Sequence, residues 1–414
     1  MEASDTIVLG AGIAGVSAGA HLLQRGQKVA LVDRRGPGEE TSYGNLGVVE
    51  ADGFMPVSFP TSIPALVRYA LNREPEVHYH PLQLMKLAPW LYGMYKASQP
   101  SRRQKFAKDV FSLERHAVAE HMALAKLAGS EDLYRDNGWV RFYRSEQSFA
   151  GVREHLEYGD HYGANYEVLT GQELTELEPH LKPLAHRAVW WKDSYTASDP
   201  GAVTRAIGSY FAANGGQVVI GDAQTLRQGA DEQWGVETRE GTLTAPRVVV
   251  ALGPWSMDLL RPLGYNFPLA IKRGYHTHYK PKGNANLGRT VVDSDKGYGI
   301  SPMTLGVRLT TGIEFADRDA KPTPVQIART HKFAQELFPL GEAVEQEPWM
   351  GRRPCFPDSF PIVDKAPNHK GLWLDFGHGH IGFTMGPVTG RLIAEMITGE
   401  TPIADPAPFS AQRF

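Results

Sequence analysis

The sequence is poor in several features that would point to particular classes of protein. Its 414 residues include one cysteine, Cys355, which excludes an intramolecular disulfide and any metal site built from several thiolates. The net charge of -3 gives no electrostatic argument for binding nucleic acid. No stretch approaches the roughly 18 uninterrupted apolar residues of a transmembrane helix, and the first residues lack the basic and apolar regions of a signal peptide. We therefore expect a cytoplasmic protein, with enough chain for two or three domains' worth of core.

The first 35 residues have the pattern of a strand, a glycine-rich turn, a helix and a second strand. The apolar run "TIVL" is followed by Gly10, Gly12 and Gly15 in the spacing G-x-G-x-x-G, and "KVALVD" ends in Asp33. In such a unit the glycines allow a tight turn, a close approach of a pyrophosphate and close helix–strand packing. The phosphates lie at the helix N-terminus, and the acid at the end of the second strand accepts hydrogen bonds from a ribose diol. The sequence predicts dinucleotide binding by these four residues together with Ile13, Ala14 and Arg34.

The residues from Asp33 onward indicate which dinucleotide is bound. Asp33 disfavours the 2′-phosphate of NADP, although Arg34 and Arg35 keep that alternative open. A polar loop with Ser42, Asn45 and Gly47 comes next, and a long helical stretch is expected from about residue 61 to 129. This long excursion is typical of two-domain flavoproteins rather than of a simple NAD-binding domain, so FAD is favoured.

A second glycine-rich loop lies near the other end of the chain. Residues 372–376 are predicted as a strand, "GHGHIGFT" as a loop, and residues 384–396 as a helix that stops near Gly399. A helix N-terminus stabilises negative charge such as that of reduced flavin. We expect Gly379 to let the flavin ring lie against the main chain, and the N–H groups of Gly382, Phe383 and Thr384 to meet its pyrimidine edge.

These motifs occur with others in an order that resembles the D-amino-acid oxidase and dehydrogenase superfamily, and bacterial D-amino-acid dehydrogenases in particular. Sarcosine, glycine and hydroxyproline oxidases are related families. The segments that carry the resemblance span nearly the whole chain: "GAGIAG" with Asp33, "TSYGNLG", "SDPGAVTRAI", "VVVALGPWS", "KRGYH", "GRRPCFPDSFPIV" and "GHGHIGFTMGPVTG".

The resemblance implies an α/β fold with two discontinuous domains. A Rossmann-like FAD-binding domain is expected from residues 1–60, 193–260 and 350–414. An α+β substrate domain with a mixed or antiparallel sheet is expected from residues 61–192 and 261–349. Gly253, after the apolar run "VVVAL", is expected where a buried strand meets the cofactor.

The resemblance also implies a substrate site. The family's carboxylate-binding arginine lies in a G-L-R-P segment, which matches "GRRP" here and points to Arg353, with Arg352 in place of the apolar residue. A guanidinium group binds a carboxylate in a bidentate manner and so fixes the orientation of an amino acid. Further pocket candidates are Tyr275, His276, His380 and Tyr43.

Metal binding and covalent flavin attachment are not expected. The pairs His378 and His380, and His276 and His278, are spaced for a shared metal, but no cluster of acids or cysteines supports them in the sequence. The cysteine that attaches flavin in sarcosine oxidases aligns with Gly351, so the resemblance implies non-covalent FAD, with Cys355 a buried or pocket residue.

The implied reaction is oxidation of an amino acid at its C–N bond. A hydride equivalent would pass from the α-carbon to flavin N5, and the imino acid would hydrolyse in water. D-Proline or D-hydroxyproline are possible substrates, and oxidation of N-methylated or other secondary amines is the alternative. An NAD-dependent reductase or a nucleotide-binding regulator explains the two glycine loops and the arginine less well.

The electron acceptor would be oxygen or a quinone of the electron-transfer chain. The apolar segment "PLQLMKLAPWLYGMYKASQPSRRQK" is compatible either with peripheral contact with the inner face of a membrane or with a core helix pair.

Overall fold

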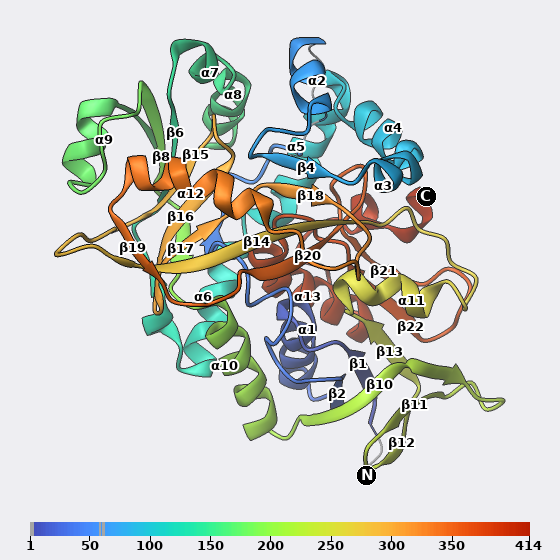
Figure 1. The fold of residues 1–414 in the computed structure, drawn as a ribbon. Coiled ribbons are helices and arrows are strands. Elements are labelled where there is room, and N and C mark those ends of the chain that lie inside the picture. Colours follow the sequence, from blue (N-terminus) through green and yellow to red (C-terminus); the bar gives the residue numbers. More distant parts are fainter. Residues whose placement is uncertain (1–3, 58, 60–62) are drawn as a thin grey trace.

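A computed structural model describes residues 4–57, 59 and 63–414 of the chain (Figure 1). The chain forms a first sheet of eight strands in the order β12-β11-β10-β2-β1-β13-β22-β21. Its five central strands run parallel, and the apolar residues of β1, β2 and β13 are almost completely buried, as expected for parallel strands with both faces covered. The strands are β1 (Thr6–Leu9), β2 (Val29–Asp33), β10 (Gln217–Gln228), β11 (Trp234–Thr238), β12 (Gly241–Ala245), β13 (Arg247–Val250), β21 (Ile362–Lys365) and β22 (Leu372–Phe376).

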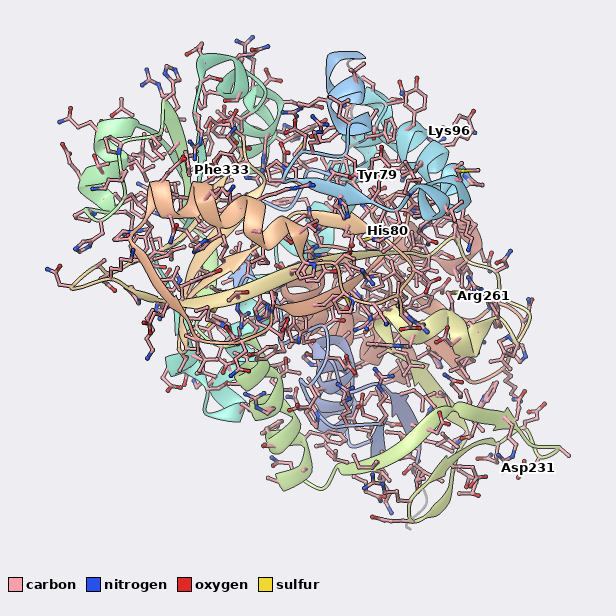
Figure 2. The ribbon with its side chains drawn as sticks, in the orientation of Figure 1. Tyr79, His80, Lys96, Asp231, Arg261 and Phe333 are labelled. Carbon is pink, nitrogen blue, oxygen red and sulfur yellow. The ribbon has the colours of Figure 1, made fainter. Side chains whose placement is uncertain are left out.

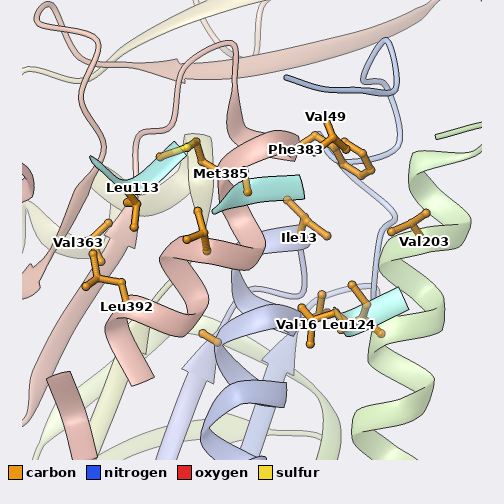
Figure 3. Packing of buried hydrophobic residues seen from close by; sticks show 14 of the residues in the cluster. Ile13, Val16, Val49, Leu113, Leu124, Val203, Val363, Phe383, Met385 and Leu392 are labelled. Atoms are coloured by element: carbon orange, nitrogen blue, oxygen red, sulfur yellow. The ribbon is translucent and has the colours of Figure 1, made fainter. Parts of the chain in front are cut away.

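One face of this sheet carries helices from both ends of the sequence. Helix α1 (Ile13–Gln24) packs directly on α13 (Gly382–Thr398), and α10 (Pro200–Ala213) lies against α1 on its other side (Figure 3). Small residues allow the close crossing, since a Cβ atom on Gly390 would lie 2.6 Å from the backbone nitrogen of Ala18. Because β1 and β22 are separated only by β13, the two glycine-rich turns end at the same edge of the sheet.

The second sheet has eleven strands and mixes parallel and antiparallel pairs, as expected. Its main path is β4-β18-β14-β17-β16-β15-β6-β8-β7, and β19 and β20 both pair with the long strand β14. The β15–β6 and β18–β4 pairs are parallel and the others antiparallel. The strands are β4 (Val77–Tyr79), β6 (Trp139–Tyr143), β7 (Tyr166–Thr170), β8 (Arg187–Trp191), β14 (Ala270–Pro281), β15 (Thr290–Asp293), β16 (Tyr298–Met303), β17 (Gly306–Thr310), β18 (Ile313–Phe315), β19 (Leu340–Ala343) and β20 (Trp349–Cys355).

A small third sheet contains three strands in the order β3 (Val48–Val49), β9 (Tyr195–Ala197) and β5 (Tyr134–Arg135). The helical stretch expected from 61 to 129 is not continuous, because β4 interrupts it and joins the second sheet. The remaining helices are α2 (Ile63–Ala70), α3 (Pro81–Lys86), α4 (Ala88–Ala97), α5 (Pro100–Glu114), α6 (Ala117–Ala128), α7 (Glu146–Ala150), α8 (Arg153–Tyr162), α9 (Gly171–Leu177), α11 (Ser256–Leu260) and α12 (Val325–Leu337).

The first sheet takes all its strands from residues 6–33, 217–250 and 362–376, and the second takes its strands from residues 77–191 and 270–355. The division into two discontinuous domains stays a prediction, and we propose that the two large sheets are the centres of those domains.

Candidate active site

A cavity of about 500 Å³ lies between the two large sheets, where the glycine-rich turns meet β14 and β20. Most residues predicted for the site line it: Gly10, Gly12, Ile13, Ala14, Asp33, Arg34, Ser42, Asn45, Gly253, Tyr275, Arg353, Gly379, His380, Gly382 and Phe383. Five predicted residues do not line it: Gly15, Tyr43, Gly47, His276 and Thr384.

The first turn is held in a shape that only small residues permit. Gly10 has φ +103°, and a Cβ atom there would lie 2.5 Å from the carbonyl oxygen of Ala251. A Cβ atom on Gly15 would overlap the carbonyl oxygen of Gly10, so Gly15 serves the contact between turn and helix. The carboxylate of Asp33 accepts hydrogen bonds from the backbone N–H groups of Ala11 (2.9 Å), Arg35 (2.7 Å) and Gly36 (3.0 Å). Asp33 therefore fixes the turn while it also lines the cavity.

The N-terminus of α1 offers donors to this cavity. The hydroxyl of Ser42 accepts a hydrogen bond from Ile13 N (2.9 Å), which explains the position of the polar loop. Within the described chain, the N–H groups of Gly12 and Ala14 have no hydrogen-bond acceptor. Free N–H groups at a helix N-terminus suit a diphosphate.

The second turn presents the same kind of surface from the opposite end of the sequence. Gly377 and Gly379 have φ values of +87° and +60°, and α13 begins two residues before the expected start. The N–H groups of Gly382 and Phe383 find no acceptor among the described residues. These two turns, with the cavity between them, fit a dinucleotide whose phosphates lie at α1 and whose electron-accepting ring lies at α13.

Thr384 has a structural role beside this turn. Its hydroxyl accepts a hydrogen bond from Glu50 N (3.1 Å) and donates one to the carbonyl of Val48 (3.2 Å). It thereby joins the end of β3 to the start of α13. Gly47 similarly serves a turn, with φ +87° and its backbone against Ala197.

Arg353 extends from β20 across Gly274 of the neighbouring strand β14. A Cβ atom on Gly274 would lie 2.7 Å from Nη2 and 2.8 Å from Cζ of Arg353, so the glycine makes room for the guanidinium group. Nη1 of Arg353 donates to the carbonyl of Gly312 at 3.2 Å, and no acidic side chain of the described chain pairs with this cation. Burial lowers the pKa of Arg353. A partly buried cation without an acid, facing a cavity, is suited to an anionic ligand.

Lys272, which faces Arg353 across the β14–β20 pair, was not predicted from the sequence. It is 2% exposed, its ammonium group lies 4.8 Å from the centre of the Trp90 ring, and it has no acidic partner among the described residues. Arg352 also lines the cavity, but its Nε donates to the carbonyl of Arg318 (3.0 Å) and its guanidinium lies 5.8 Å from the Trp255 ring.

The two histidines of the second turn differ in their surroundings. His378 Nε2 lies 3.0 Å from the hydroxyl of Thr389 and 3.2 Å from Asp375, so this ring is tied to the fold. His380 Nε2 is buried and has no hydrogen-bond partner among the described residues. Burial, followed by the charges of Arg353 and Lys272, holds the pKa of His380 well below its usual value, so its imidazole is neutral.

The predicted aromatic residues are more engaged in packing than expected. The hydroxyl of Tyr275 donates to Glu314 (2.7 Å), although the residue lines the cavity. His276 stacks on Trp349, with ring centres 4.8 Å apart, and Tyr43 lies against both. Trp349 itself lines the cavity and was missed, although it stands two residues before Gly351 of the "GRRP" segment.

Two groups of side chains in the described residues bring possible metal-binding atoms within 4.8 Å of one another: His78, His80 and Glu314, and His276, His278 and Glu345. In the second group both nitrogens of His278 are engaged, because Nε2 accepts from Arg308 Nε (2.9 Å) and Nδ1 contacts Glu345. In the first group, Glu314 accepts from Arg273, Tyr275 and Thr323. The absence of a metal stays a prediction. So does non-covalent attachment of FAD, with Cys355 a buried free thiol.

Comparison with known proteins decides the family. The family described as "FAD dependent oxidoreductase" (DAO) matches residues 5–396. The chain belongs to this family. It is an FAD-dependent oxidoreductase with FAD as its cofactor, as the sequence predicted, and the two glycine turns are the parts that fit the cofactor.

Curated relatives in the DAO family cover almost the whole chain. A D-amino-acid oxidase of Bradyrhizobium diazoefficiens is 29% identical over 427 residues, which cover 100% of this chain and 99% of the relative. A D-amino acid dehydrogenase of Paramagnetospirillum magneticum is 29% identical, with 95% and 94% covered.

Solved structures share the DAO fold over their full length. A glycine oxidase of Geobacillus kaustophilus superposes with a TM-score of 0.76 at 22% identity, with 100% of both chains covered. An L-proline dehydrogenase of P. horikoshii gives a TM-score of 0.74 at 18% identity, covering 100% of this chain and 98% of the other. At these identities the likeness shows the fold alone.

Proposed function

We propose that the protein oxidises an amino acid of the D series at its C–N bond. The observation that carries this proposal is a pair of cations, Arg353 lining the cavity and the buried Lys272 beside it, neither of which has an acidic partner in the described chain. An amino acid supplies the missing carboxylate. The names of the two curated relatives support the D series.

In this proposal the chain's own residues bind and orient the substrate. Arg353 binds the carboxylate and so directs the α-carbon toward the second glycine turn. Because Arg353 lines the cavity and the buried Lys272 lies close by, a substrate ammonium loses a proton more readily there than in water. When bound, FAD would supply the chemistry by accepting a hydride, that is two electrons and one proton, from the α-carbon of the substrate. The N–H groups of Gly382 and Phe383 would offer hydrogen bonds that favour its anionic reduced state.

The neutral state of His380 suits this cavity. An imidazolium at this position would add a third positive charge beside Arg353 and Lys272, and burial opposes it. The neutral ring leaves Nε2 free to exchange a hydrogen bond with the substrate amine, which is the direct role that we propose for His380.

Anaerobic bleaching of the bound flavin tests the proposal. The purified protein is mixed with D-amino acids, their L enantiomers, proline analogues and sarcosine, and loss of flavin absorbance is followed. We expect D-amino acids to reduce the flavin fastest. Faster reduction by sarcosine or by other secondary amines than by any D-amino acid would instead establish the alternative, an oxidase of N-methylated amines.

Arg353→Lys, compared with the matched variant Arg352→Lys, tests the carboxylate site. We expect KM to rise for the first variant with FAD still bound, because lysine cannot form the bidentate pair. The second variant should change KM little, since Arg352 is held by the Arg318 carbonyl. A larger effect at Arg352 would show that the neighbouring arginine binds the carboxylate.

We further propose that the acceptor is a quinone reached from a membrane surface. Leu82 and Met85 of α3 and Tyr92 of α4 are 76%, 72% and 59% exposed, and Lys86 and Lys96 lie on the same helices. Figure 2 shows Lys96 on α4 at the outer edge of the molecule. Exposed apolar side chains flanked by lysines suit an anionic lipid surface.

The membrane contact would be peripheral. None of the helices in the described residues is long and apolar enough to pass through a bilayer. Sedimentation with anionic vesicles should deplete the protein from solution, and the double variant Leu82→Glu, Met85→Glu should abolish this. Equal sedimentation of the variant would exclude α3 as the contact, and rapid oxidation of the reduced protein by oxygen alone would exclude the quinone.

A further inference from the structure

A second set of charged groups lines the same cavity. Glu50 follows β3 directly, and Arg141 projects from β6 of the second sheet. Apolar residues next to them also line the cavity: Val48 precedes Glu50 by two residues, Trp139 lies beside Arg141, and Val292 pairs with Arg141 across the β15–β6 ladder. Neither charged residue was singled out in the sequence, because 91 residues separate them and neither belongs to a glycine-rich motif.

The carboxylate of Glu50 faces the cavity without a protein donor. The backbone of Glu50 is fixed, since its N–H donates to Thr384. Among the described residues, its carboxylate accepts no hydrogen bond and forms no ion pair. The neighbouring acid differs in this respect: Glu114 Oε1 accepts from Gly53 N at 2.9 Å. Burial and then the charge of Asp52 raise the pKa of Glu50 to about 7.

Arg141 is likewise incompletely satisfied. Its Nε is buried and has no hydrogen-bond partner, and none of the described acids forms an ion pair with it. Its guanidinium group lies 4.9 Å from the centre of the Trp139 ring. Its charge lowers the pKa of both Glu50 and Asp52, so it is close enough to act on these carboxyl groups.

The charges of Arg141 and Arg353 act on different neighbours. Arg353 influences the pKa of Cys355 and His380, whereas Arg141 influences Glu50, Asp52 and His155. The cavity thus has a cation without an acid at Arg353. Elsewhere it has the Glu50 carboxylate without a protein donor, and Arg141, which interacts with Tyr143 but whose Nε has no partner among the described residues.

We propose that Glu50 and Arg141 form a subsite for the substrate side chain, which selects amino acids bearing a neutral hydroxyl or carboxamide group. Both groups donate one hydrogen bond and accept another, so either satisfies the carboxylate and the guanidinium together. This inference rests on the proposed function, because it assumes an amino acid held by Arg353.

Other side chains fit this subsite less well. A cationic side chain meets the charge of Arg141, and an anionic one meets Glu50 with Asp52 and Glu114 behind it. An apolar side chain leaves Glu50 without a donor, and Arg141 with Tyr143 as its hydrogen-bond partner, after water has been displaced. Leaving charged groups short of partners in this way is costly. A site built to form hydrogen bonds with a substrate rejects an isosteric analogue that lacks the hydrogen-bonding groups.

Two isosteric pairs of substrates test the inference on the FAD-loaded protein. D-threonine is compared with D-valine for the hydroxyl, and D-asparagine with D-leucine for the carboxamide. We expect kcat/KM to be at least about tenfold higher for the polar member of one or both pairs, since a hydrogen bond to a charged group contributes this much. Values within twofold in both pairs would overturn the inference while the proposed function stands. If none of these four amino acids bleaches the flavin while another D-amino acid does, the inference falls and the proposed function stands. If no D-amino acid of the wider panel bleaches it, the proposed function falls as well.

Matched variants locate the preference. Glu50→Leu should remove the preference without loss of bound FAD, and should raise activity toward D-valine or D-leucine. The control is Glu114→Gln, which keeps the acceptor for Gly53 N and changes a neighbouring buried acid that does not line the cavity. It should keep the preference. Loss of the preference in the control but not in Glu50→Leu would overturn the assignment.

A binding measurement is independent of turnover and of whether the variants fold. 3-Hydroxybutyrate and 3-methylbutyrate correspond to threonine and valine without the α-amine, so neither is oxidised at a C–N bond. Calorimetric titration of the wild-type protein should give at least about tenfold tighter binding of the hydroxy acid. Equal dissociation constants would contradict the hydroxyl arm of the inference.

Discussion

Gly274 offers a test of the carboxylate site that leaves Arg353 itself in place. In Gly274→Ala the new Cβ atom would lie 2.7 Å from Nη2 and 2.8 Å from Cζ of Arg353, which is closer than real Cβ contacts. The obstructed atoms belong to the far end of a flexible side chain, so we expect the guanidinium group to move and the strand to stay.

The cost then appears in substrate binding rather than in folding. A hydrogen bond to a charged group contributes about 1.5–3 kcal/mol, so loss of one of the two bonds to a carboxylate corresponds to a fall of about 10- to 150-fold in kcat/KM. Alanine is compatible with the backbone here, because Gly274 does not have a positive φ.

Steady-state kinetics with the best D-amino acid, together with thermal denaturation, is the assay. The matched control is Gly235→Ala on β11, where a Cβ atom would meet its nearest neighbour at an ordinary 3.5 Å. We expect the control to keep both kcat/KM and Tm. A Gly274→Ala protein with unchanged KM would refute the view that Arg353 holds the substrate from its present position.

Three further predictions concern stability. Gly390→Ala should lower the free energy of unfolding by about 1–3 kcal/mol, because its Cβ atom would lie 2.6 Å from Ala18 N in the α1–α13 contact; an unchanged urea midpoint would contradict this. Thr384→Val should lower the free energy of unfolding by about 1–3 kcal/mol, because it removes the two hydrogen bonds that join β3 to α13; the urea midpoint measures this as well. A loss no larger than that caused by the same change at an exposed threonine would show that these hydrogen bonds are dispensable. Glu50 has a folded-state pKa of about 7, raised from 4.5 by burial, so it binds more protons in the folded state and destabilises the protein progressively from pH 4.5 to 7. The free energy of unfolding of Glu50→Gln should therefore exceed that of wild type at pH 8 by about 3 kcal/mol at most. This difference should vanish below pH 4.5. A gain in the free energy of unfolding that is the same at both pH values would contradict the raised pKa.

The two glycine turns could be predicted from the sequence because their chemistry is local. A strand, a turn with required glycines and a helix N-terminus follow one another within about 15 residues, and Gly10 and Gly382 accordingly line the cavity. The mixed second sheet also followed from the resemblance. The break of the helical stretch by β4 was missed, because three residues that pair with β18 through distant contacts leave no periodic pattern.

The parts of the site that were missed depend on pairing between distant segments. Lys272 faces Arg353 only because β14 and β20 pair in one register, and Gly274 clears space for that arginine for the same reason. The hydroxyl of Tyr275 is taken up by Glu314, which is 39 residues away. Such relations depend on tertiary packing, which a single sequence does not display.

The close crossing of α1 and α13 also bears on how the protein acquires its cofactor during synthesis. The first turns of both helices line the same cavity, yet residues 13–24 leave the ribosome long before residues 382–398. Until α13 is synthesised and packs on it, α1 lies beside strands β1 and β2 with a stripe of glycine and alanine residues exposed. We therefore expect nascent chains to bind FAD tightly only near the end of translation, and ribosome-bound intermediates that lack α13 should release the flavin readily.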